Sequence, residues 1–230
     1  MKTARYIIKT LFFVAFIVAG FGFTKAFVML LAKPWAEWQS GNGLWLSAGF
    51  VIYIPLHIIF RRLIVLHVFG HELTHALWSM LFGGKIHEIY VSRNRGGFAT
   101  YTKGNFLVTL APYFFPLYAV FFLILHLIVA NSFKPYIDIL LGASISFHVF
   151  LTIYSLRIGQ QDLKRAGVVF SLVFIYMMNC VVLGLIISTA TGSDSISFLK
   201  YGFSAFPELF RYINEIKGPL FERLNPVKQY

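Results

Sequence analysis

The stretch LIVLHVFGHELTHALWSMLF, residues 63–82, decides how the chain folds. It is long enough to cross a bilayer, because about 20 apolar residues in a helix span the hydrocarbon core. Four ionisable side chains nevertheless lie within it, namely His67, His71, Glu72 and His75. A carboxylate at mid-membrane costs about 2.5 kcal/mol or more, so ionisable residues in such a place generally mark a functional site. The stretch therefore predicts a membrane helix that carries chemistry.

The composition agrees with a membrane protein. Hydrophobic residues make up 58% of the 230 residues and charged residues 13%, whereas about a quarter are charged in soluble domains. The net charge of +11 comes from dispersed Lys and Arg, which we interpret as juxtamembrane residues facing lipid headgroups. We expect the lipid bilayer as a partner and no nucleic acid. Residues 1–20 superficially resemble a signal peptide, but no small-residue cleavage site follows, so we interpret them as part of an uncleaved first span.

Six segments have the length and apolarity of membrane-spanning helices. They are approximately Tyr6–Leu31, Leu44–Phe60, Leu63–Phe82, Phe106–Ala130, Ile137–Ile158 and Gly167–Thr189. Pro112 and Pro116 are expected to kink the fourth segment, because proline interrupts helical hydrogen bonding. Lys and Arg are shared so evenly between the two sides that they do not decide the orientation. The expected fold class is an all-α polytopic membrane protein of about six transmembrane helices.

Two segments depart from this pattern. Residues 85–103 hold β-branched and aromatic runs on either side of RNRGG, which predicts a small β-hairpin after the polar helix. Apolar residues from Phe206 to Leu220 keep helical spacing with charges between them, which predicts a C-terminal amphipathic helix on the membrane surface. Packing of this helix against the bundle is the alternative. We divide the chain into a transmembrane core, residues 1–189, and a surface tail, residues 190–230.

The HELTH segment, residues 71–75, predicts a zinc site. His71 and His75 are four residues apart, so they project from one face of a helix as two metal ligands must. Glu72 stands beside them in the position of a general base, the residue that takes a proton from zinc-activated water in HExxH enzymes. The alternative to a zinc site is a buried polar cluster whose hydrogen bonds only stabilise the packing of the helices.

This helix, the Gly-Gly turn after it and the predicted hairpin resemble the site-2 protease family of intramembrane zinc metalloproteases. The resemblance is strongest over residues 63–110 and weaker to about residue 189. It implies one zinc ion per chain, bound by His71 and His75, with Glu72 as the catalytic base. It also implies hydrolysis of a peptide bond in or near a membrane span of a substrate, which we expect to be a single-span membrane protein. The expected location is multi-pass in a membrane of the bacterial cytoplasmic type.

The third zinc ligand is less evident. The family usually supplies an Asp from an Asn-Pro-Asp-Gly or Leu-Asp-Gly motif, and this chain contains neither. Between residue 110 and the tail, Asp138 and Asp162 are the only acidic residues. We favour Asp162, because QQDL at residues 160–163 resembles the Asp-bearing entry to a late helix in divergent members. Asp138 looks like a helix-start acid, Asp162 could instead pair with neighbouring basic residues, and His67 could replace either as a ligand.

The other polar residues of the predicted helices allow more than one interpretation. His67, His148 and Asn179 could hydrogen-bond around the metal or stabilise the transition state, or make only bonds within the bundle. A non-catalytic polytopic membrane protein of protease-like fold is the alternative function. A di-iron membrane oxidoreductase is a more distant one, because the 7 His include no adjacent pair and no second histidine box.

Overall fold

The computed structural model describes residues 2–40, 42–59, 64–92, 96–157 and 161–213. This part of the chain is mostly helical and includes one small antiparallel hairpin. Its elements are α1 (Lys2–Leu31), α2 (Trp35–Ser40), α3 (Gly43–Ile59), α4 (Ile64–Leu81), β1 (Ile86–Ser92), β2 (Gly96–Tyr101), α5 (Phe106–Phe114), α6 (Leu117–Ile128), η2 (Asn131–Phe133), α7 (Lys134–Arg157), α8 (Gln161–Ala166), α9 (Val168–Ala190) and α10 (Ser195–Phe203).

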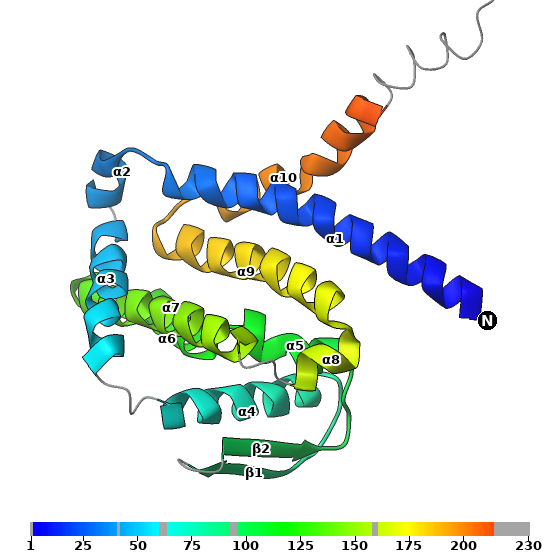
Figure 1. Ribbon diagram of the computed structural model, residues 1–230. Coiled ribbons are helices and arrows are strands. Elements are labelled where there is room, and N and C mark those ends of the chain that lie inside the picture. The colour runs from blue at the N-terminus through cyan, green and yellow to red at the C-terminus, as the bar shows by residue number, and fades with distance from the viewer. Residues whose placement is uncertain (1, 41, 60–63, 93–95, 158–160, 214–230) are drawn as a thin grey trace, which may run out of the picture.

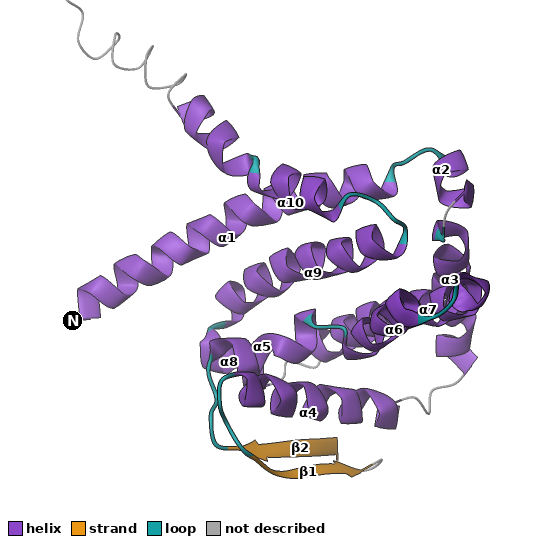
Figure 2. Cartoon of the chain, turned by 180° about the vertical axis from the view of Figure 1, so that it is seen from behind, coloured by secondary structure: helices purple, strands orange, loops and turns teal. Residues whose placement is uncertain are grey.

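The long helices lie in a stack, which runs from α1 through α9 and the α5–α7 group to α4, with the hairpin beyond α4 (Figure 1). The view from behind shows the same order (Figure 2). Aromatic rings join the first two layers, because Phe16 of α1 lies 5.1 Å from Phe174 of α9 between ring centroids. The interior of the stack is apolar, and one hydrophobic cluster connects α1, α5, α7 and α9.

Glycines bring α3 and α7 into close contact. A side chain at Gly49 would collide with the carbonyl group of Ile139, and one at Gly142 with that of Leu46. Small residues of this kind allow two helix backbones to approach in a membrane, where van der Waals packing drives helix association. The fifth predicted segment is therefore held firmly against the second.

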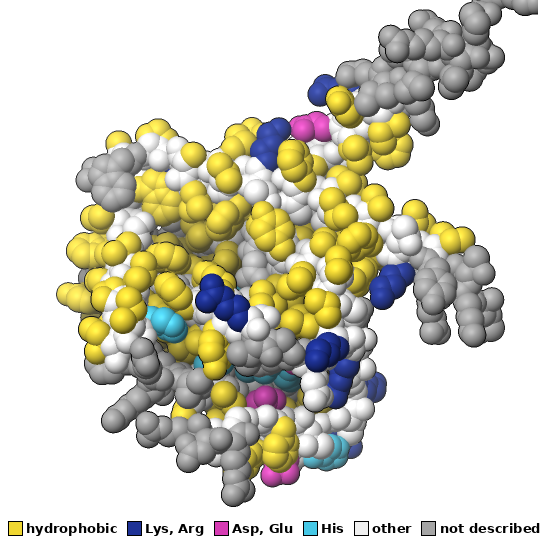
Figure 3. All heavy atoms as spheres, viewed as in Figure 1, with side chains coloured by type: hydrophobic (Ala, Val, Ile, Leu, Met, Phe, Trp, Pro, Cys, Tyr) yellow, Lys and Arg dark blue, Asp and Glu magenta, His cyan; other side chains and the backbone are white. Residues whose placement is uncertain are grey.

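The prediction of six membrane spans is not confirmed. Among the described residues, three helices are long and apolar enough to cross a membrane: Ile7–Leu31, Asn131–Arg157 and Val168–Ala190. The bent pair α5 and α6 would make a fourth. Helix α3 has only 17 residues, and α4 is made less apolar by its three histidines and Glu72. The face in Figure 3 is largely hydrophobic with scattered charges, as expected of an integral membrane protein.

The predicted kink is confirmed. Helices α5 and α6 meet at an angle of 70°, and Pro112 and Pro116 lie at or near the break. Helix α5 thus ends in mid-bundle, and its last carbonyl groups need partners outside the helix. The carbonyl of Tyr113 finds one in Asn179 of α9, whose Nδ2 donates to it over 2.8 Å.

The predicted hairpin is also confirmed. Strands β1 and β2 pair antiparallel, with Tyr90 opposite Phe98. Both strands contact α4. The turn residues 93–95 lie outside the described residues. The hairpin extends along α4 on the side away from the other helices (Figures 1 and 2).

The tail begins with a helix that packs on the bundle. Phe198 and Phe203 of α10 lie 5.8 and 5.1 Å from Phe23 of α1 between ring centroids. Residues 205–213 continue as helix, and this segment projects away from the stack (Figure 1). The rest of the predicted amphipathic helix lies outside the described residues.

Candidate metal centre

Helix α4 presents two histidines to the interior, as their spacing predicts. The rings of His71 and His75 lie 4.9 Å apart between centroids, and both residues are buried. The ring of His75 is oriented by a hydrogen bond from its Nδ1 to the carbonyl oxygen of Val108, 2.8 Å away. Since a carbonyl can only accept, Nδ1 carries a proton, and in the neutral ring the lone pair that can bind a metal is then on Nε2.

Asp162 reaches the same point from the short helix α8. Its Oδ2 lies 3.6 Å from Nε2 of His71 and 3.5 Å from Nε2 of His75. The ligand atoms of these three residues all lie within 4.8 Å of one another, close enough to hold one metal ion. The structure therefore brings together the three residues that the sequence predicts as ligands.

The charge state of Asp162 suits a cation. Burial by itself would raise the pKa of this carboxyl, but its interactions with His71 and His75 outweigh burial and hold that pKa below the usual range. Asp162 is therefore ionised at neutral pH, and its negative charge lies beside the ring nitrogens of His71 and His75.

Glu72 lines the same cleft as the three residues. The cleft has a volume of about 650 Å³ and lies between α4, β2 and α8. The hairpin approaches Glu72 closely, since a Cβ atom at Gly97 would lie 2.5 Å from Cγ1 of Val68 and 3.1 Å from Cγ of Glu72. Ala99 of β2 lines the same cleft as Glu72. Strand β2 thus forms one wall of the cleft and contacts the predicted base.

Asp138 lies elsewhere. It is fully buried in α7, and its Oδ1 lies 2.6 Å from Nδ1 of His126 on α6. This carboxylate is absent from the group that could hold a metal among the described residues. This placement agrees with the preference for Asp162 over Asp138 as the candidate third ligand.

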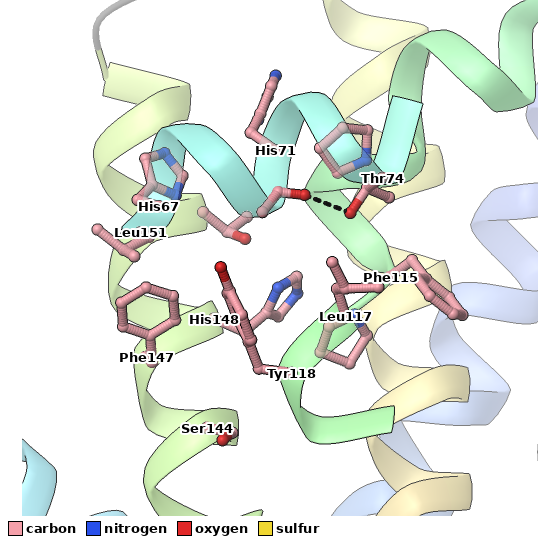
Figure 4. A pocket seen from close by; sticks show the side chains of 14 residues that line it. His67, His71, Thr74, Phe115, Leu117, Tyr118, Ser144, Phe147, His148 and Leu151 are labelled. Atoms are coloured by element: carbon pink, nitrogen blue, oxygen red, sulfur yellow. Dashed lines mark hydrogen bonds between the residues drawn. The ribbon is translucent and has the colours of Figure 1, made fainter. Parts of the chain in front are cut away.

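His67 and His148 lie around a second, smaller cavity of about 30 Å³, which His71 also lines (Figure 4), and His67 lines the main cleft as well. His67 interacts through Nε2 with the Ser155 hydroxyl over 3.0 Å, and is not part of the metal-holding group. His148 interacts through Nε2 with Oδ1 of Asn179, also over 3.0 Å. The cavity is large enough for a water molecule and is lined by several polar groups.

Three residues of the centre were missed by sequence reasoning. The hydroxyl of Tyr113 donates to Oδ2 of Asp162 over 3.2 Å, and the Tyr113 ring lies edge-on to His71, 5.3 Å between centroids. Tyr101 and Arg165 line the main cleft. Burial raises the pKa of the Tyr101 hydroxyl, and the charge of Asp162 raises it further, so it remains a hydrogen-bond donor. Nothing in the sequence distinguishes Tyr113 from the aromatic residues around it.

Comparison with known families agrees with this geometry. A family model described as Peptidase M50B-like matches residues 43–210, which include α4, the hairpin and α8. The chain belongs to this family, which confirms the resemblance to site-2 proteases, and it is an integral membrane protein. No curated protein and no solved structure matches the chain.

Proposed function

We propose that the protein is an intramembrane zinc metalloprotease, which hydrolyses a peptide bond in or near a transmembrane segment of its substrate. The observation that carries the proposal is the meeting of His71, His75 and Asp162 beside Glu72 in one cleft. Membership of a peptidase family supports it independently.

The donor set suits one zinc ion. Two imidazole nitrogens and one carboxylate oxygen are ligands that zinc commonly takes, and catalytic sites keep a fourth position open. With bonds of about 2.0–2.1 Å, donors around a tetrahedral ion lie roughly 3.3 Å apart. The distances of 3.5 and 3.6 Å from Asp162 to the two histidines come close to this value. A single carboxylate among three donors does not favour a di-iron centre.

Each protein group has a role in the reaction that we propose. When bound, zinc supplies a Lewis acid that polarises the scissile carbonyl and lowers the pKa of a water molecule toward neutrality. The Glu72 carboxylate accepts a proton from this water and later gives it to the amine nitrogen of the leaving group. Tyr113 holds the carboxylate of Asp162 by its hydroxyl group, and Val108 holds the ring of His75.

The cleft also suits an unwound substrate. A substrate helix hides its peptide bonds, so the segment to be cut has to be extended first. Strand β2 lines the cleft along Gly97, Phe98 and Ala99, and within the described residues it pairs with β1 on one side only. An extended peptide could therefore add to the hairpin by backbone hydrogen bonds. We propose a single-span membrane protein as the substrate and a bacterial-type cytoplasmic membrane as the location.

A direct test is to reconstitute the wild type and Glu72→Gln in liposomes with a single-span substrate, and to measure zinc and cleavage in both. We expect one zinc per chain in each protein and cleavage only by the wild type. Zinc without cleavage in the wild type, across a panel of substrates, would favour a non-catalytic protein of protease-like fold. Iron in pairs would exclude the zinc protease.

A further inference from the structure

A separate groove opens on the side of the bundle between α1, α5, α8 and α9. It has a volume of about 630 Å³, and five of its lining residues are phenylalanines, among them Phe12 of α1 and Phe106 of α5. Its apolar wall is suited to contact with a hydrocarbon chain. The groove adjoins α8, but none of the proposed zinc ligands lines it.

Two cations stand in this apolar groove, Lys9 of α1 and Arg165 of α8. Among the described residues that line it, none is acidic. The ammonium group of Lys9 lies over the ring of Phe170, 5.3 Å from its centroid. Two positive charges beside a phenylalanine wall are complementary to a ligand that has an anionic head and an apolar chain.

Both cations lie near the ends of candidate membrane spans. Helices α1 and α9 both begin at the same side of the bundle (Figure 1). Lys9 lies two residues inside the first candidate span, Ile7–Leu31, and Arg165 lies three residues before the last, Val168–Ala190. Lys and Arg at the ends of spans reach the interface, where anionic lipids attract them.

We propose that this groove binds one anionic phospholipid, with its phosphate between Lys9 and Arg165 and an acyl chain along the phenylalanines. The proposal does not depend on the proteolytic function. It has a consequence for the metal centre, because α8 has only six residues. Arg165 and Asp162 share this helix, and Arg165 also lines the main cleft. A bound lipid would hold α8, and with it Asp162, against the bundle.

The test is lipid binding by the full-length protein in detergent, measured by native mass spectrometry with dioleoyl phosphatidylglycerol and with dioleoyl phosphatidylcholine. We expect the wild type to retain one phosphatidylglycerol in preference to phosphatidylcholine. Lys9→Gln and Arg165→Gln should each weaken retention about fivefold, since one Lys or Arg near an anionic surface contributes about 1 kcal/mol. Lys9→Arg keeps the charge and should keep the binding.

Lys164→Gln is the matched control, because Lys164 is an exposed neighbour of Arg165 on α8 that does not line the groove. It should bind phosphatidylglycerol as the wild type does. Equal losses in Lys164→Gln and Arg165→Gln, or equal retention of the two lipids by the wild type, would show that only general surface charge is involved and overturn the proposal. Displacement of the lipid by the same concentration of inorganic phosphate would overturn it as well, in favour of a free-phosphate site.

Discussion

Replacing Tyr113 by Phe removes one hydroxyl group from the wall of the metal centre and little else. The residue is buried, and its hydroxyl donates to Oδ2 of Asp162 over 3.2 Å. Its ring contact with His71 and its backbone bond from Asn179 do not involve the hydroxyl, so they remain in the variant. The fold should therefore persist while the Asp162 carboxylate loses a partner.

The magnitude follows from that hydrogen bond. A hydrogen bond to a charged group contributes about 1.5–3 kcal/mol, and a length of 3.2 Å is at the long end of the normal range. We take the lower value, which corresponds to roughly tenfold weaker zinc binding. This agrees with the losses of about 10- to 100-fold on removing groups that hydrogen-bond metal ligands in other proteins.

The assay is a zinc titration of the purified, metal-free protein against a competing chelator. Tyr118→Phe is the matched control, because its hydroxyl donates to the carbonyl of Leu66 and not to a proposed ligand. It should bind zinc as the wild type does. If Tyr113→Phe binds zinc with unchanged affinity, or if both variants weaken it equally, the proposed role of Tyr113 in positioning Asp162 is wrong.

Three further predictions concern the same centre. Glu72→Gln should keep its zinc and lose about 10²- to 10⁴-fold in cleavage rate, since it loses only proton transfer; wild-type cleavage by this variant in liposomes would contradict the mechanism. Elemental analysis should find that Asp162→Asn loses zinc and that Asp138→Asn keeps it. Full zinc occupancy in both variants would contradict Asp162 as the third ligand and favour His67 instead. Zinc at 100 times its dissociation constant should stabilise the metal-free protein by about 2.7 kcal/mol, which thermal unfolding can detect, and an unchanged melting temperature would argue against a zinc site.

The local elements could be predicted because their causes are local. The i, i+4 spacing of His71 and His75 determines their common face on any helix. The run RNRGG between two β-prone segments favours a hairpin, and two prolines in an apolar segment favour a bend. None of these features needs a partner from elsewhere in the chain.

The number of spans could not be predicted in the same way. Apolar length alone treats α4 like the other helices, although its polar residues face a cleft between α4, β2 and α8 rather than lipid. The packing of the tail could not be predicted either, because α10 packs against Phe23, which lies far away in the sequence. Packing partners of this kind are not visible in local periodicity.

The sequence by itself determined that HELTH lies on an apolar helix with two histidines and a carboxylate at metal-site spacing. Only the tertiary structure decided which acid joins them. The sequence favoured Asp162 over Asp138 only through the resemblance of QQDL to divergent family members. In the structure, α6 and α7 bury Asp138 against His126, whereas α8 directs Asp162 toward His71 and His75. The physical reason is that a metal site needs donor atoms a few ångströms apart, and for residues far apart in the chain this distance is decided by helix packing.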